Sequence, residues 1–568
     1  MLVRTTVKNL VLILFASSCL VAHGRIISPA DAGQDRTTAL WSTVDWSVNN
    51  DQLNGNPFDI IAAVTFRHDE SNEIHRTAMF YTGRNRWCFR FTPTRSGRWS
   101  FVTQCDGRDG TSRNAALHKI NGIVKVSAEP AGLGRGFITH FGNKWGWSGS
   151  RDVFVPQYVM GRNLDAYYDR TAERIDEAKI DRDIREFVIE HGFTGFHLQG
   201  RGRWFNLTGR IGKDPNPDPR TYEVLETIIR NVYCRGGACH IWMWGSDGKN
   251  KGEGPRWLID GPMNAADKRN LRYLAARLGP LPGWTMGYGY DTENLWASAE
   301  ELDAWKEFIE SHSGWDHLLG SRVGYDEKGF WGRYGDRSKA PLNAKHNAPV
   351  GDQYMTWLGG DYMGYTSYRP LYDRYVKVLE HRPEKPSFDE DRFRLRNRKE
   401  WKHKDYSEEL TIKGLWHSAM AGGVANIWGN LLPDDNEGGS QSYDHGNVDI
   451  KHLIKTYAAF FRDKRRFRRD FVRDNALADP RKGTTEVPQS PSISVCLRNP
   501  DMTNFIFYKE DAGSVGMDLS EMKDAEPAVA VDAHRAYKEI DLGILKPRKQ
   551  RWRAPYASTW AIAVGRFE

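Results

Sequence analysis

The run Lys385-Pro-Ser-Phe-Asp-Glu-Asp-Arg-Phe-Arg394 places Glu390 shortly after a short apolar stretch. About a hundred residues earlier, Gly287-Tyr-Gly-Tyr-Asp-Thr-Glu293 places a second glutamate after an aromatic stretch. Short stretches of this kind are typical of strands, and helical patterns separate the two. Glu293 and Glu390 are therefore expected at the ends of two strands of one α/β unit.

Strand and helix patterns alternate through the middle of the chain. The expected strands are 153–159, 192–198, 239–244, 284–290, 317–321, 362–365, 386–388 and 423–428. Amphipathic stretches lie between them, for example at 172–190, 262–278 and 298–311. Eight such repeats predict a (β/α)8 TIM barrel with enlarged loops. An open doubly wound sheet is the competing architecture, but no Gly-rich phosphate loop follows an early strand.

Strand-rich patterns flank this middle part. Short alternating strands are expected at 60–66, 86–91, 98–102 and 122–126, and Pro93 and Gly97 are predicted to connect residues 86–102 as a hairpin. Strands return at 492–497, 504–508 and 559–564. A chain of 568 residues is too long for one core. The predicted multidomain organisation is a signal peptide (1–24), an N-terminal β-sandwich (25–135), the catalytic barrel (136–475) and a small C-terminal all-β domain (476–568).

Residues 1–24 have the pattern of a secretory signal. Arg4 and Lys8 precede an apolar core, and Ala22-His-Gly24 fits cleavage after small residues. A secreted or periplasmic protein is therefore expected, with a lipoprotein anchored at Cys19 as the alternative. No later stretch reaches about 18 apolar residues, so no membrane span is predicted. Removing the signal lowers the formal net charge from +7 to +5, a surplus that does not indicate nucleic-acid binding.

Export permits disulfides, and the sequence has six cysteines. Cys234 and Cys239 bracket a short loop, and the bonded and free forms both stay open. Cys88 is out of phase with the apolar alternation of its strand, whereas Cys105 is in phase with Phe101, so the two are expected on opposite faces. No Cys/His cluster has zinc spacing, so neither a metal nor another cofactor is predicted.

The two glutamates suit hydrolysis of a glycosidic bond. Barrel enzymes carry their catalytic residues at the C-terminal ends of the strands, and Glu293 and Glu390 follow the expected fourth and seventh strands. One carboxyl would protonate the leaving oxygen, and the other would attack the sugar carbon or activate water. A loop salt bridge is the alternative role for either acid.

Other polar and aromatic residues near strand ends are candidates for sugar binding, through ring stacking or hydrogen bonds. For each of them alone, core packing or loop capping is an equal alternative. The candidates are His197, Gln199, Arg201, Trp244, Asp291, Tyr365, Tyr368, Trp428 and Asn430.

Arg392 and Arg394 begin a run of alternating arginines that continues to Arg398. In an extended segment these side chains would share a face, and guanidinium groups match the geometry of sulfate and carboxylate. An anionic polysaccharide, sulfated or uronate-containing, is one interpretation. A solvated basic loop paired with neighbouring acids is the other.

The chain resembles bacterial secreted glycoside hydrolases with an apiosidase-like (β/α)8 catalytic domain. The motifs that carry the resemblance are Arg90-Phe-Thr-Pro93, Ser96-Gly-Arg-Trp99, Gly287-Tyr-Gly-Tyr-Asp291, Asp389-Glu-Asp-Arg-Phe-Arg394 and the run 414–430. The tail resembles a small β-domain often labelled collagen-binding. The resemblance implies a retaining, clan A-like mechanism with Glu390 as nucleophile and Glu293 as general acid/base. Thr292 stands where the wider group has asparagine before the acid/base glutamate, so that assignment departs from the family pattern.

The expected function is a secreted retaining glycoside hydrolase that acts on an algal or plant polysaccharide or oligosaccharide. Two alternatives stay open. A non-catalytic surface protein would bind glycans through the β-domains and tryptophans, and a polysaccharide lyase would act on uronates. The sequence does not indicate the oligomeric state.

Overall fold

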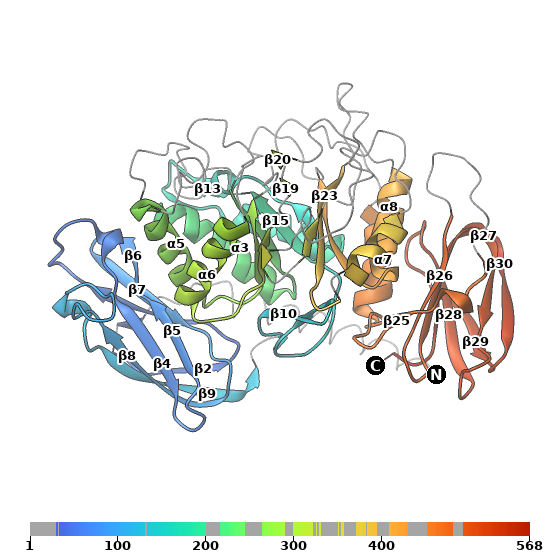
Figure 1. Ribbon diagram of the computed structural model, residues 1–568, viewed down its shortest axis with the longest axis horizontal. Helices are drawn as coiled ribbons and strands as arrows, with labels where there is room; N and C mark the ends of the chain where they lie inside the picture. Colours follow the sequence, from blue (N-terminus) through green and yellow to red (C-terminus); the bar gives the residue numbers. More distant parts are fainter. Residues whose placement is uncertain are drawn as a thin grey trace, which may run out of the picture.

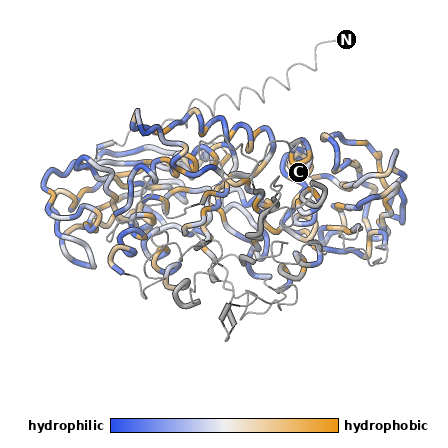
Figure 2. The backbone as a smooth tube through the Cα atoms, turned by 90° about the horizontal axis from the view of Figure 1, so that it is seen from above, coloured by the Kyte–Doolittle hydropathy of each residue, from blue (hydrophilic) through white to orange (hydrophobic). Residues whose placement is uncertain are grey.

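The computed structural model describes residues 30–31, 33–130, 133–199, 216–244, 264–289, 299–321, 325–326, 329–330, 350–351, 354–356, 371–381, 383–394, 408–429, 451–480 and 492–567. These segments form two N-terminal sheets, a central parallel sheet with helices, and a C-terminal sheet (Figure 1). Hydrophobic and hydrophilic residues alternate along the chain in the sheets at both ends (Figure 2).

The central sheet has nine strands among the described residues, of which eight run parallel. In sheet order the parallel strands are β18 (Leu319–Ser321), β17 (Trp284–Gly289), β16 (Cys239–Trp244), β15 (Gly195–Gln199), β12 (Gln157–Met160), β24 (Val424–Gly429), β23 (Ser387–Arg394) and β22 (Tyr354–Thr356). β21 (Val350–Gly351) pairs antiparallel with β18. The sheet curls with helices on its outside, as in a TIM barrel (Figure 1), and this part of the predicted fold is confirmed.

The helices follow the strands as the alternation predicted. They are α2 (Glu177–Ile184), α3 (Pro219–Cys234), α5 (Ala265–Leu278), α6 (Ala299–Ser313), α7 (Leu371–His381), α8 (Glu408–Met420) and α9 (Lys451–Ala458). Local sequence explains their starts. Asp218 caps α3 with Pro219 next to it, and Asn264 and Asp267 form a reciprocal capping box on α5.

Two strand boundaries differ from the expectation. The parallel strand beside β23 is β22 at Tyr354–Thr356, whereas the expected sixth strand at 362–365 lies outside the described residues. β23 runs from Ser387 to Arg394, so Glu390 belongs to the strand instead of following it. The strand is longer than expected because the charged residues after Phe388 continue to pair with β24, as far as Arg394 with Gly429.

The N-terminal residues form two sheets. One has the order β1 (Ala30–Asp31), β3 (Val44–Asn49), β7 (Arg86–Phe91), β6 (Phe80–Gly83), and the other β2 (Arg36–Leu40), β9 (Asn121–Pro130), β8 (Gly97–Gln104), β4 (Ala63–His68), β5 (Ile74–Ala78). One aromatic core joins them, with Trp46 stacked on Phe89 in its own sheet and 6.0 Å from Phe66 in the other.

The predicted hairpin of residues 86–102 is wrong. β7 pairs with β3 and β6, and β8 pairs with β4 and β9, so the two strands belong to different sheets. Phe89 and Phe91 of β7 and Trp99 of β8 fill the same core from opposite sides. A hairpin would place these rings side by side on one face, whereas the crossing lets them interdigitate.

The described residues of the C-terminal sheet form six strands, in the order β25 (Val472–Arg473), β26 (Ser494–Arg498), β27 (Phe505–Asp518), β30 (Lys549–Val564), β28 (Glu526–Asp532), β29 (Ile540–Leu545). Its inner face packs on α8, where His417 Nε2 lies 2.7 Å from Glu510 Oε1 and both side chains are fully buried. The domain boundaries given above stay predictions.

The described cysteines are Cys88, Cys105, Cys234, Cys239 and Cys496, and no disulfide joins any two of them. The Cys234–Cys239 bond is therefore not formed. Cys88 packs toward the barrel helices and Cys105 toward the sandwich core, which confirms that they face opposite ways. None of the described helices is long and apolar enough to cross a membrane.

Candidate active site

The interior of the barrel is filled by side chains that meet across the sheet. Phe388 of β23 lies 4.3 Å from the His240 ring of β16, although three strands separate them in the sheet order. Tyr158 of β12 completes this layer, at 6.0 Å from Phe388. The interior is therefore a packed core, as expected for a TIM barrel, and leaves no room for substrate at this level.

His240 is fully buried in this layer and is uncharged. Its Nδ1 lies 2.8 Å from the Thr285 hydroxyl of β17, and burial lowers the pKa of the imidazole to about 3. A neutral ring at this depth suits packing between Tyr158 and Phe388. His240 is therefore part of the packed interior of the barrel, between Tyr158 and Phe388.

A β-bulge in β23 contains Glu390. Asp389 pairs with Asn426 of β24, and Arg392 pairs with the next residue, Ile427, so Glu390 and Asp391 are extra residues on β23. Bulges of this kind occur next to active sites, where they redirect the chain. The bulge follows directly on Phe388, whose buried ring anchors the strand. The main chain at Glu390 therefore departs from regular pairing two residues beyond the packed core.

His197 is placed inside the barrel by β15. Its side chain is fully buried, with its ring 4.0 Å from Trp242 and 5.4 Å from His240. This position extends the packed interior toward the strand ends. A direct sugar contact by His197 is not supported by this burial.

Trp428 lies on the outer side of β24. Ala425 and Ile427 point into the barrel interior, whereas Trp428 packs among helix residues and is 1% exposed. Its indole Nε1 donates to Gln157 Oε1 at 3.2 Å. The side chain is therefore part of the layer between strands and helices, and the structure does not place it with the substrate candidates at the mouth.

The other candidates are described in part or not at all. The main chains of Gln199 and Trp244 end β15 and β16, and those of Glu390, Arg392 and Arg394 belong to β23, while their side chains lie outside the described structure. Arg201, Asp291, Glu293, Tyr365, Tyr368 and Asn430 lie outside the described residues altogether. The structure therefore shows that the ends of β15, β16 and β23 belong to one sheet, and it does not describe the side chains that these ends carry.

Gln157 is a buried polar residue that the sequence reasoning missed. It begins β12, and its side chain joins Ser418 of α8 to Asn426 and Trp428 of β24. Tyr375 of α7 donates to Asn426 Oδ1 at 2.9 Å. This network fixes β24 beside the bulge of β23. A glutamine at the start of an otherwise apolar strand was the available signal.

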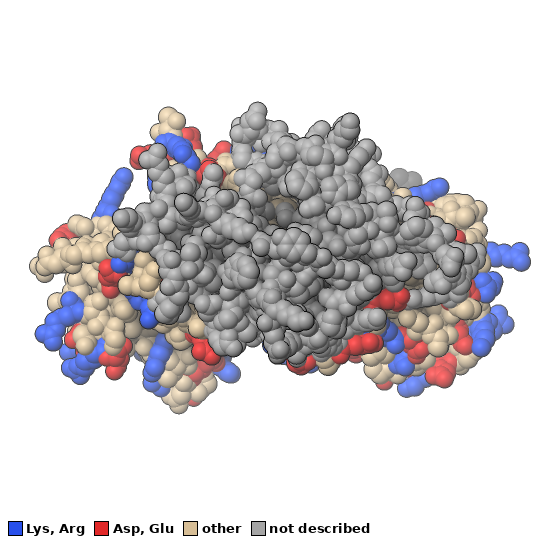
Figure 3. All heavy atoms as spheres, turned by 45° about the horizontal axis from the view of Figure 1, so that its top comes forward, with Lys and Arg blue, Asp and Glu red and all other residues tan. Residues whose placement is uncertain are grey.

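In the part of the chain that the structure describes, no group of three or more His, Cys, Asp and Glu side chains could hold a metal. Figure 3 shows the face of the molecule toward the strand ends, where Lys and Arg are interspersed with Asp and Glu on the described residues of both ends. Those residues form no patch of a single sign on that face.

Comparison with known proteins agrees with this fold. Residues 37–106 match a family described as a domain of unknown function, DUF5060. No curated protein matches the chain. A candidate glycoside hydrolase from Bacteroides vulgatus ATCC 8482 superimposes with a TM-score of 0.64 at 15% identity, covering 94% of this chain and 100% of its own.

Two further solved structures are similar over a smaller part. A glycoside hydrolase of family 5 from the same organism has a TM-score of 0.52 at 12% identity, over 76% of this chain and 94% of its own. Another structure, described only as a glycoside hydrolase, has a TM-score of 0.51 at 12% identity, over 76% of this chain and 97% of its own. The chain therefore has a glycoside-hydrolase-like fold.

Proposed function

We propose that the protein is a retaining glycoside hydrolase in which Glu390 is the nucleophile and Glu293 the general acid/base. The observation that carries the proposal is the bulge at Glu390 and Asp391 in the seventh parallel strand of the barrel. Bulges re-aim side chains, and catalysis in barrels of this kind takes place at the C-terminal strand ends.

The fold likeness supports the same activity. The three similar structures reported above are all described as glycoside hydrolases. Fold alone does not fix function, since one barrel hosts many chemistries. The proposal therefore depends on the two glutamates, and the neighbours favour hydrolysis among the chemistries that a pair of carboxyls can perform.

The reaction would proceed by double displacement. Glu390 would attack the anomeric carbon while Glu293 donates a proton to the leaving oxygen, which gives a covalent glycosyl-enzyme. Glu293, now ionised, would take a proton from water as that water attacks the anomeric carbon and releases Glu390. A separation of about 5 Å between the two carboxyl groups is what this mechanism requires.

The proposed substrate class rests on candidate residues near the expected strand ends. Gln199, Trp244, Asp291, Tyr365 and Tyr368, together with Arg201 and Asn430, are proposed to bind sugar near the strand ends. Arg392 and Arg394 follow the bulge in β23, so the proposed substrate is an anionic algal or plant glycan with sulfate or uronate groups. Residues 1–24 favour a secreted or periplasmic location.

The test is release of reducing ends by the purified protein from neutral, uronate-containing and sulfated polysaccharides. Proton NMR of the first product formed reports whether the anomeric configuration is retained. We expect release from an acidic glycan with retention. Inversion would contradict the nucleophilic role of Glu390, and ultraviolet absorption by unsaturated ends would indicate a lyase.

A further inference from the structure

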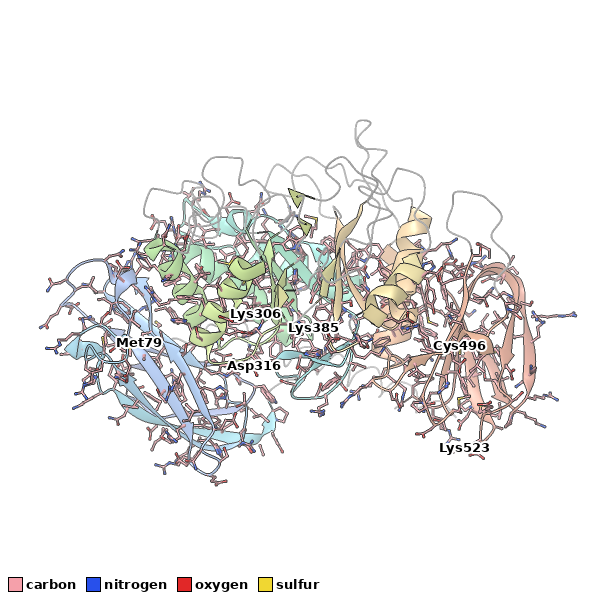
Figure 4. All side chains as sticks on the ribbon, viewed as in Figure 1. Met79, Lys306, Asp316, Lys385, Cys496 and Lys523 are labelled. Atoms are coloured by element: carbon pink, nitrogen blue, oxygen red, sulfur yellow. The ribbon has the colours of Figure 1, made fainter. Side chains whose placement is uncertain are left out.

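A large cavity lies at the opposite end of the barrel from the proposed active site. Its volume is about 1070 Å³, and it is lined by residues that precede or begin β12, β15 and β16, among them Val155, Thr194 and Gly237. These are the N-terminal ends of parallel strands. Lys385 and Asp316, which precede β23 and β18, mark the same lower side of the barrel in Figure 4. Barrel enzymes do not use this end for catalysis, so the cavity needs a separate explanation.

The cavity carries an excess of positive charge. Seven arginines and three aspartates line it. Three of the arginines have carboxylate partners, since Arg468 pairs with Asp470, Arg462 with Asp463 and Arg235 with Asp181. The other four have no ion pair among the described residues, and they are Arg135, Arg151, Arg465 and Arg469. Asp152 also lines the cavity and its charge acts on Arg135, and the surplus of arginines over aspartates that remains favours a ligand that carries negative charge.

Aromatic faces hold three of these four arginines in place. The guanidinium carbons of Arg151 and Arg469 lie 4.8 and 4.2 Å from the centre of the same ring, that of Phe141. Arg135 lies 5.6 Å from the Trp147 ring. Burial lowers the pKa of Arg135, the charge of Asp152 raises it, and the nearby charges of Arg462 and Arg465 lower it. Stacked guanidinium groups lose little further freedom when they bind an anion, because the rings already orient them.

The remaining lining suits the apolar face of a sugar. Trp147, Phe193 and Phe467 form part of the cavity wall, although each of these side chains is buried. Leu133 and Ile189 also line the cavity and are 55% and 53% exposed, which is unusual for large apolar side chains. The indole N–H of Trp147 is buried and has no acceptor among the described residues. A buried donor of this kind is stabilised by a ligand oxygen.

We propose that this cavity binds an acidic saccharide, with its sulfate or carboxylate group on Arg151 and Arg469 and its ring against the exposed apolar lining of Leu133 and Ile189. A sugar ring offers an apolar C–H face and polar oxygens in one molecule, and the acidic group supplies the missing negative charge. A bare inorganic anion would leave most of the volume unfilled. Binding here needs no turnover, so the proposal is tested separately from the hydrolase activity.

The test is calorimetric titration of the full protein at low ionic strength, where charge pairs are screened least. The probes are a galacturonate trisaccharide, a sulfated galactose disaccharide, neutral galactotriose and sodium sulfate. The cavity variant is Arg151→Ala with Arg469→Ala, both exposed in the free protein. The matched control is Arg548→Ala with Arg553→Ala. Arg548 directly precedes β30 and Arg553 lies in it, both are exposed, and neither has an ion pair with another described residue. Thermal melting verifies that both variants fold.

We expect one of the two acidic saccharides to bind, with affinity at least about tenfold lower in the cavity variant and unchanged in the control. Which acidic saccharide binds distinguishes sulfate from carboxylate recognition. The proposal is overturned if neither binds, if galactotriose or sulfate alone binds as tightly, or if the cavity variant binds as well as the control.

Discussion

The indole Nε1 of Trp145 donates a hydrogen bond to the main-chain oxygen of Ser387, 3.0 Å away. Trp145 belongs to the hairpin of β10 (Ile138–Phe141) and β11 (Lys144–Trp147) at the lower end of the barrel, and Ser387 is the first residue of β23. The Trp145 ring is fully buried and lies 6.3 Å from Phe388, edge to face. The strand that carries Glu390 is therefore held at its base by the hairpin, so the hairpin contributes to the position of the bulge.

Trp145→Phe keeps an aromatic ring and removes the donor to Ser387. We expect a loss of about 1 kcal/mol in the free energy of unfolding, as for a typical buried hydrogen bond, and a several-fold lower kcat with little change in KM. Denaturant melts and steady-state kinetics on the identified substrate measure both. The matched control is Trp99→Phe, because Trp99 is equally buried and donates to the Arg95 oxygen in the sandwich. Equal loss of kcat in both variants would contradict a positioning role for Trp145.

Glu226 joins the sandwich to the barrel. It lies on α3 within 2.9 Å of Arg90 in β7, and it also accepts hydrogen bonds from Arg277 in α5. Glu226→Gln should leave the two buried arginines short of negative charge and lower the free energy of unfolding by about 3–5 kcal/mol at neutral pH. Denaturant melts measure this loss. Glu223→Gln is the control, since burial raises the pKa of Glu223 and its charge gives no comparable stabilisation.

The same pair of variants tests a pH dependence. Burial alone would raise the pKa of Glu226, but the charges and hydrogen bonds of Arg277 and Arg90 lower it from 4.5 to about 2. Because the folded pKa lies below the unfolded value, the stabilisation is complete above the unfolded value and is lost as the pH falls toward 2. The difference in melting temperature between the wild type and Glu226→Gln should therefore shrink across this window. A constant difference would show that folding does not lower the pKa of Glu226.

Trp428→Phe tests the placement of this residue outside the barrel. Loss of the hydrogen bond to Gln157 should reduce stability by about 1 kcal/mol, and KM should stay within about twofold of the wild type. Trp244→Phe is the comparison, because Trp244 ends β16 and is proposed to stack on sugar, so its KM should rise several-fold. A large rise in KM for Trp428→Phe alone would reverse the two assignments.

The central fold could be predicted because its signal is local and repeated. Apolar strands alternating with amphipathic helices identify a curled parallel sheet, and five of the expected strands overlap β15, β16, β17, β18 and β24 closely, whereas the seventh covers only the start of β23. The first expected strand began four residues before β12. The end of β23 could not be predicted from its own residues. Charged residues such as Asp389 and Arg392 belong to this strand because they pair with the neighbouring strand β24.

Pairing between distant strands could not be predicted in the same way. Residues 86–102 have the length and turn residues of a hairpin, yet β7 and β8 belong to different sheets. The choice depends on partners far along the chain, β3 and β4, that offer matching aromatic faces. Likewise, side chains along β24 alternate between the barrel interior and the helices. Trp428 faces the helices because its neighbour Ile427 lies inside the barrel, and the sequence alone does not show which of the two faces inward.

The most direct test of the central claim is the rate of glycan cleavage by Glu390→Gln beside Asp391→Asn, with circular dichroism to verify folding. Both residues occupy the same bulge of β23, so a general disturbance of the strand would affect them alike. We predict that Glu390→Gln loses at least about a thousandfold in kcat and that Asp391→Asn keeps most of its activity. Activity retained by folded Glu390→Gln, or lost equally in both variants, would contradict the assignment of Glu390 as the nucleophile.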